Sequence, residues 1–190
     1  VRAIGPALKA AGNKVLFFGL IIAQLGLVVY LSARVAKMAP ATAGTLFLAY
    51  SALTGVTFSL ILLAYTGASV ANAFFITAGM FGALAVYGSV TKRDLTGMGR
   101  FMFMGLVGLV IASVVGIFWQ NDAMQFVMGV VGVLVFSGLI AYDTQRLRAM
   151  ALEVSGEQVG SYAIVGALSL YLDFINLFIS LLRLFGDRRN

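Results

Sequence analysis

Six long apolar runs dominate this 190-residue sequence and restrict what it can fold into. Each run is about 20 residues long, the length at which an α-helix crosses the hydrocarbon core of a bilayer. The alternating pattern of an outer-membrane strand is absent from the sequence, and an open sheet edge leaves backbone groups unsatisfied in lipid. The sequence therefore predicts an all-α integral membrane protein, a polytopic helical bundle that forms a single domain over residues 1–190. The six spans are expected at residues 15–35, 42–65, 70–90, 101–119, 123–142 and 162–185.

The composition agrees with a membrane protein. Hydrophobic residues make up 61% of the chain and charged residues 11%, whereas a soluble domain keeps roughly a quarter of its residues charged. The net charge of +6 could suggest nucleic acid, but the 13 Lys and Arg residues lie in small groups between apolar runs. A nucleic-acid surface needs a continuous basic face. We therefore expect the lipid bilayer, and no nucleic acid, as a partner.

The basic residues also predict the topology. The first, third and fifth connections carry Arg34, Lys92 and Arg146, while the second and fourth carry no Lys or Arg. By the positive-inside rule, the three basic connections face the cytoplasm. Six spans then place both termini outside, together with a basic N-terminal arm. A further helix upstream would remove that conflict, so we expect that this chain lacks its first span. The basic residues of the arm are Arg2, Lys9 and Lys14.

The residue types limit the chemistry. The sequence has no cysteine and no histidine, which excludes thiol chemistry and Ser-His-Asp catalysis and disfavours a transition-metal centre. Two intramembrane aspartates would suit an aspartyl protease, but no Gly-Xaa-Gly-Asp motif precedes Asp173. We therefore expect no enzymatic activity and no resident cofactor. Carboxylates remain suitable for Ca²⁺ and for protons.

Asp173 is an ionisable residue within the last apolar run. Polar and small residues spaced three or four apart share its helical face, and such a stripe must face protein or water. One interpretation is a structural hydrogen-bond seam between helices. The cost of an ionisable group in a membrane favours a functional interpretation. The stripe comprises Gly166, Ser169, Asp173, Asn176, Ser180 and Arg183.

Asp143, at the end of the fifth run, is a weaker candidate. Arg146 lies three residues further on and could pair with it at the cytoplasmic edge. The predicted depths of the two aspartates in the membrane also disagree. A last span that starts at Tyr162 places Asp173 roughly 16 Å beyond that start, whereas Asp143 lies at the edge of the fifth span. Asp143 would meet Asp173 only if that span starts nearer Leu168 or the last helix is displaced toward the cytoplasm.

Small residues recur at helix-packing spacing in two other runs. Gly108, Ala112 and Gly116 form one row, and Ala78 and Gly82 form another. We interpret both rows as close contacts between helices.

Four segments of the sequence resemble the Bax inhibitor-1 (transmembrane Bax-inhibitor-motif) family, most closely its bacterial inner-membrane members. The resemblance extends from about Val15 to the C-terminus. It implies seven helices around a central C-terminal helix, of which the six spans here would be the second to the seventh. It also implies a multi-pass protein of the bacterial inner membrane. The segments are SALTGVT (51–57), TKRDL (91–95), GLIAYDTQ (138–145) and ALSLYLDFINLF (167–178).

The resemblance further implies a pH-sensitive Ca²⁺ leak channel. Asp143 and Asp173 match the paired aspartates of the family, which share a proton and are the expected Ca²⁺ ligands. By position, Arg34 matches an arginine that latches the pair, and Gln24 falls where some relatives carry a carboxylate. Two carboxylates in contact cannot both ionise cheaply, so such a pair titrates as one unit. The alternatives are a non-conducting regulator that binds a membrane protease and a proton/calcium exchanger.

Overall fold

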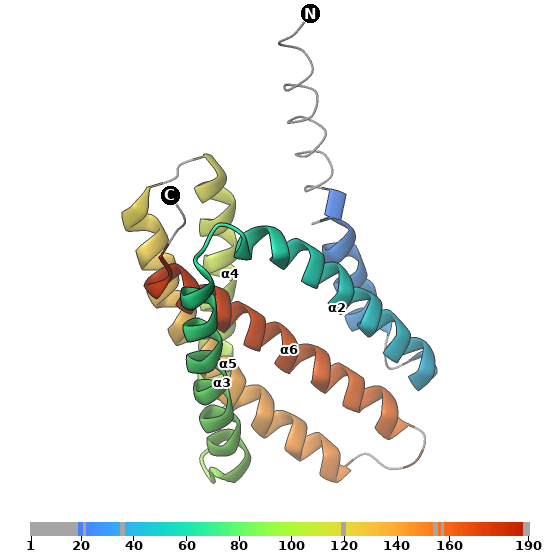
Figure 1. The fold of residues 1–190 in the computed structure, drawn as a ribbon. Helices are drawn as coiled ribbons and strands as arrows, with labels where there is room; N and C mark the ends of the chain where they lie inside the picture. The colour runs from blue at the N-terminus through green and yellow to red at the C-terminus, as the bar shows by residue number, and fades with distance from the viewer. Residues whose placement is uncertain are drawn as a thin grey trace, which may run out of the picture. The chain divides into compact units, whose positions relative to one another are not determined.

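The computed structural model describes residues 19–20, 22–34, 37–118, 121–153, 156 and 158–187. Each of its five long helices is long and apolar enough to cross a membrane. A shorter apolar helix, Ile22–Arg34, precedes them. The protein is therefore an all-α polytopic membrane protein, as predicted. In chain order, the long helices are α2 (Pro40–Leu62), α3 (Gly67–Val90), α4 (Thr96–Phe118), α5 (Asp122–Glu153) and α6 (Gln158–Phe185) (Figure 1).

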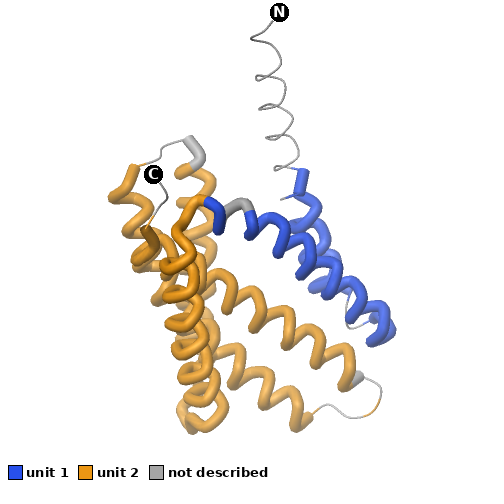
Figure 2. The backbone as a smooth tube through the Cα atoms, viewed as in Figure 1, with its two compact units in different colours: residues 1–63 blue, residues 64–190 orange. Residues whose placement is uncertain are grey.

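The chain divides into two compact units, residues 1–63 and residues 64–190 (Figure 2). The first unit contains the helix Ile22–Arg34 and α2. Gln24 joins these two helices, because its Nε2 donates hydrogen bonds to the Leu53 carbonyl at 2.7 Å and to Thr57 Oγ1 at 2.6 Å. That all 190 residues form one domain stays a prediction.

In the second unit, α5 packs against α3, α4 and α6, and α6 also packs against α3. Figure 1 shows α5 and α6 as neighbouring helices. Their contact is apolar at its centre, where Ile140 and Leu177 are completely buried. These two residues share one hydrophobic cluster with Val135, Phe136, Leu139 and Leu181. The central position that the resemblance implies for α6 in the whole bundle stays a prediction.

Large apolar side chains cover the outer surface of the helices. Phe75 is 73% exposed, Phe101 66% and Leu134 63%. A soluble protein rarely exposes apolar surface on this scale, because contiguous apolar patches associate in water. These side chains are therefore expected to face lipid, which dissolves them.

The length of α5 corrects the expectation that Asp143 ends the fifth helix. The 32 residues of α5 extend roughly 48 Å at 1.5 Å per residue, well beyond a hydrocarbon core of about 30 Å. The helix continues because residues 144–153 contain no Gly or Pro and consist mainly of strong helix formers. Asp143 thus lies inside α5, and the extension beyond it lies beside the first turns of α6, where a Cβ at Gly166 would meet Leu147. The two aspartates therefore meet although α6 starts at Gln158.

The ends of α2, α3, α4 and α6 lie within five residues of the predicted bounds. The predicted span over residues 15–35 lies partly outside the described residues.

Candidate functional site

Asp143 and Asp173 lie together where α5 packs against α6. Their carboxyl groups face each other within hydrogen-bonding reach. Asp173 is only 7% exposed, and among the described residues its buried Oδ2 has no hydrogen-bond partner. Ionised carboxylates are acceptors only, so a hydrogen bond between two carboxyl groups requires a proton on one of them. The two carboxyl groups, the aspartate pair, therefore lie where a single proton would join them.

A cavity of about 800 Å³ opens beside the aspartate pair. It lies between α4, α5 and α6, and both aspartates line it. Arg100 from α4 and Arg146 from α5 bring positive charge to its wall. Arg146 attracts Asp143 electrostatically. Asp143 therefore interacts both with Arg146, three residues further along α5, and with Asp173 on α6. The lining also includes Ser169 and Asn176 from the predicted stripe.

The polar stripe on α6 serves two purposes. Part of it is structural, since Asn176 Nδ2 donates to the Leu172 carbonyl at 2.8 Å and Ser180 Oγ donates to the Asn176 carbonyl at 2.7 Å. Ser180 also packs tightly against Gly132, where an added Cβ would collide with it. The same face also borders open space, because Asn176, Ser180 and Arg183 line a second cavity of about 270 Å³. This second cavity shares Asn176 with the cavity of the aspartate pair.

Gln145, two residues after Asp143, fixes the connection between α3 and α4. Its Oε1 accepts a hydrogen bond from the Leu95 backbone N–H at 2.9 Å, and its Nε2 donates to the Arg93 carbonyl at 2.7 Å. Arg148 Nη1 donates to the Ser89 carbonyl nearby. The sequence alone gives no role to Gln145. The available signal was that it lies in one matching segment, 138–145, and its partners lie in another, 91–95.

A comparison with known protein families identifies the family of this chain. The family described as "Inhibitor of apoptosis-promoting Bax1" matches residues 3–190. The chain belongs to the Bax inhibitor-1 family.

Bacterial members of the Bax inhibitor-1 family are similar over most of the chain. Inner membrane protein YbhL of Escherichia coli (strain K12) is 51% identical over 180 residues, which cover 93% of this chain and 77% of that protein. Uncharacterized protein RP147 of Rickettsia prowazekii is 46% identical over 176 residues, covering 91% and 75%. An uncharacterized membrane protein of Streptococcus pyogenes serotype M1 is 44% identical over 171 residues, covering 90% and 74%. These relatives and the apolar helices identify a multi-pass membrane protein of the bacterial inner membrane.

Two residues that the Bax inhibitor-1 resemblance singled out lie in the first unit. Arg34 is the last residue of the helix Ile22–Arg34, and its side chain is exposed. Its pairing with the aspartates of the second unit stays a prediction. Gln24 binds Leu53 and Thr57 of the family segment 51–57. In this family member, that segment therefore contributes to packing within the first unit.

The aspartate pair can contact a cation but cannot enclose one. Ca²⁺ takes six to eight oxygen ligands, and the pair offers two carboxyl groups beside Asn176 and Ser169. In the part of the chain that the structure describes, no group of three or more His, Cys, Asp or Glu side chains gathers at one place. Most ligands of a passing Ca²⁺ would therefore be water molecules.

Proposed function

We propose that this Bax inhibitor-1 family member is a pH-sensitive Ca²⁺ leak channel without enzymatic activity, and that the aspartate pair is its pH sensor. The observation that carries the proposal is the meeting of the Asp143 and Asp173 carboxyl groups on the wall of one cavity. A shared proton holds α5 and α6 together at this point. Gain or loss of a proton changes the charge that faces the cavity by one unit, which makes the cavity respond to pH without histidine.

The charges around the aspartate pair set the direction of the response. With one shared proton, the pair carries a single negative charge opposite Arg100 and Arg146. The helix α3, which packs against both α5 and α6, contributes no carboxylate, Lys or Arg. A second proton removes the negative charge and weakens the hold of the pair on Ca²⁺ and on Arg34, the proposed latch. Flux should therefore depend on pH between about 5 and 8, a range in which the sequence offers no histidine to titrate.

The stripe on α6 offers a path for the ion. Asp173, Asn176, Ser180 and Arg183 follow one another along one face, and they cover about 15 Å along the helix axis at 1.5 Å per residue. The two cavities beside this face share Asn176 together with the apolar side chains of Leu106 and Phe136. Weak coordination by few protein oxygens suits conduction, because an ion must leave each site as readily as it enters.

Ca²⁺ flux into liposomes that contain the purified full chain tests the proposal. Asp143→Asn and Asp173→Asn should each lose most of the pH dependence of flux. The double variant should add little, because the two residues act as one unit. Asp122→Asn is the matched control, since it removes an exposed carboxylate from the first turn of the same helix α5. Additive effects of the two substitutions, or a normal pH profile in Asp173→Asn, would refute the proposed sensor.

The proposed latch has its own variant in the same assay. Arg34→Ala should raise basal flux at neutral pH, because the charged pair loses its counter-charge, while Lys37→Ala, which removes a neighbouring exposed charge, should not. Unchanged flux in Arg34→Ala would exclude Arg34 as the latch.

The assay also separates the alternatives. A non-conducting partner of a membrane protease gives no flux, and a proton/calcium exchanger gives flux only against a proton counter-gradient.

A further inference from the structure

A charged cavity of about 500 Å³ lies where the connection between α3 and α4 meets the end of α5. Three cationic side chains line it, Lys92 and Arg93 from the connection and Arg146 from α5. All three are exposed. Two carboxylates, Asp94 and Glu153, also line the cavity. Whether the cavity attracts an anion depends on the charge of these two carboxylates and on the groups that they bind.

Asp94 is already engaged by the start of α4. Its Oδ1 accepts a hydrogen bond from the Thr96 backbone N–H at 2.9 Å. Hydrogen bonds from the Thr96 hydroxyl and backbone N–H, helped by the charge of Arg100, hold the pKa of Asp94 below its usual value. Asp94 is therefore an ionised acceptor for α4. Asp94 and Glu153 both keep their negative charge, but three cations against two carboxylates leave the lining with a net charge of +1, which favours an anion from outside the protein.

The cationic side chains project from a fixed backbone. Gln145 holds both the carbonyl of Arg93 and the N–H of Leu95, and Arg148 holds the carbonyl of Ser89. The connection is thus tied to α5 on both sides of Lys92 and Arg93. A site whose backbone is already positioned loses less entropy when it binds a ligand.

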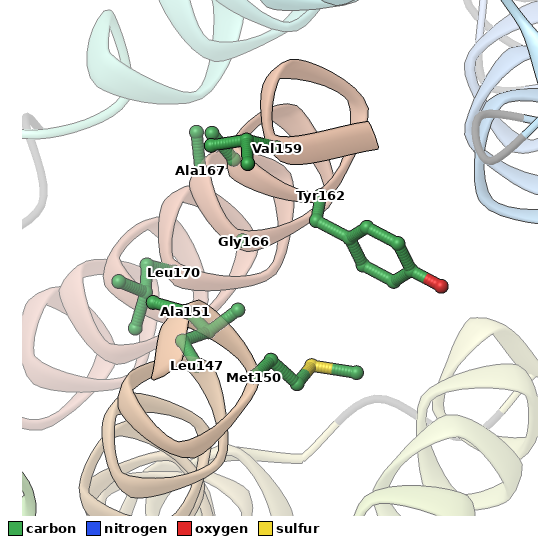
Figure 3. A pocket seen from close by; sticks show the side chains of 9 residues that line it. Leu147, Met150, Ala151, Val159, Tyr162, Gly166, Ala167 and Leu170 are labelled. Atoms are coloured by element: carbon green, nitrogen blue, oxygen red, sulfur yellow. The ribbon is translucent and has the colours of Figure 1, made fainter. Parts of the chain in front are cut away.

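Exposed apolar residues lie close in sequence to the charged lining. Val90 at the end of α3, Phe101 in α4 and Leu152 in α5 are 65%, 66% and 80% exposed. On an adjacent face of α5, an apolar cavity of about 310 Å³ lies between α5 and α6 (Figure 3). Met150 lines both cavities. A cationic cavity that adjoins an apolar one at a membrane boundary suits an amphiphile better than a free anion.

We propose that this site binds an anionic phospholipid. Lys92 and Arg93 hold the phosphate of its headgroup, and one acyl chain passes Met150 into the apolar cavity lined by Leu147, Tyr162 and Leu170. Charge-assisted hydrogen bonds from Lys and Arg to phosphate oxygens supply the selectivity over zwitterionic lipid. The binding does not require that the protein conducts Ca²⁺.

Native mass spectrometry of the detergent-solubilised full chain, titrated with phosphatidylglycerol or phosphatidylcholine, tests this site. The wild-type protein should bind phosphatidylglycerol preferentially. Lys92→Gln/Arg93→Gln should bind it about 30-fold more weakly, because each lost charge near a membrane surface costs roughly a factor of five. Arg188→Gln/Arg189→Gln removes the same charge elsewhere in the sequence and should bind like the wild type.

A second variant moves the affinity in the opposite direction. Glu153→Gln removes a carboxylate from the cavity and should strengthen the binding of phosphatidylglycerol by about fivefold. A misfolded variant would lose lipid binding, so stronger binding by Glu153→Gln cannot result from misfolding. Equal binding of the two lipids by the wild type, or unchanged binding in Lys92→Gln/Arg93→Gln, would overturn the proposal. Equally tight binding of glycerol 3-phosphate would overturn the lipid as the occupant.

Discussion

The contact between α3 and α5 can be tested by Gly88→Ala. A Cβ at position 88 would collide with the carbonyl oxygen of Ala141 and lie 3.0 Å from its Cα and its carbonyl carbon. All three atoms belong to the backbone of α5, so no side chain can rotate away. The carbonyl oxygen would be the nearest of the three atoms, so restoring a contact distance of about 3.5 Å requires the two helices to separate by more than about 1 Å.

Two opposing effects decide the stability of this variant. Overpacking a close contact typically costs about 1–3 kcal/mol, whereas alanine gains about 1 kcal/mol over glycine in a helix interior. The free energy of unfolding should therefore fall by up to about 2 kcal/mol. Gly82→Ala, in the same helix, gains the same helix propensity without a collision, since nothing among the described residues lies within 4 Å of its added Cβ.

The assay is the loss of folded protein on heating in detergent, followed by fluorescence-detected size-exclusion chromatography. The thermal midpoint of Gly88→Ala should fall by a few degrees, while that of Gly82→Ala should equal or exceed the wild-type value. A variant Gly88→Ala that is as stable as Gly82→Ala would mean that the backbones of α3 and α5 do not touch at this point.

Three further predictions concern the connection between α3 and α4 and the topology. Gln145→Leu removes two hydrogen bonds to this connection and should lower the free energy of unfolding by about 1–3 kcal/mol. Hydrogen exchange in residues 91–98 should become faster, whereas Gln125→Leu, near the start of α5, should leave that exchange unchanged. Asp94→Ala should make stability less sensitive to acid between pH 5 and pH 3, because a carboxylate whose pKa is lowered in the folded state stabilises at neutral pH and loses that contribution as it is protonated; an unchanged pH profile would contradict the engagement of Asp94. In intact cells, an impermeant maleimide should label Asn121→Cys but label Lys92→Cys only after permeabilisation, and the reverse result would invert the predicted topology.

The sequence predicts the membrane-spanning helices well, because apolar length alone determines them. It predicts the length of α5 poorly. The last ten residues of this helix are polar enough to leave the hydrocarbon core, and a hydropathy pattern detects the apolar run but not a helix that continues into water. The same extension decides whether Asp143 can meet Asp173. The pairing could be inferred only from the resemblance, and the geometry came from the structure.

Spacing along a helix was a poor guide to the closest contacts. At Gly108 and Gly82 an added Cβ would meet nothing within 4 Å among the described residues, whereas at Gly116 it would meet the side chain of Met124. The close approaches occur instead at Gly88 and Gly105, the second of which meets the side chain of Val135. Spacing identifies which residues share a helical face. Which face meets a neighbouring helix depends on how the helices pack, and a single sequence does not contain that information directly.

The close contact between Gly88 and Ala141 fixes the point about which α5 would tilt against α3. Asp143 lies two residues from this crossing and Glu153 twelve, which is about 3 Å and 18 Å along the axis. A tilt of about 10° around the crossing would move Glu153 by roughly 3 Å but Asp143 by only about 0.5 Å. A tilt of α5 about this contact would therefore leave Asp143 almost stationary, whereas a displacement of α6 would separate the two carboxyl groups directly.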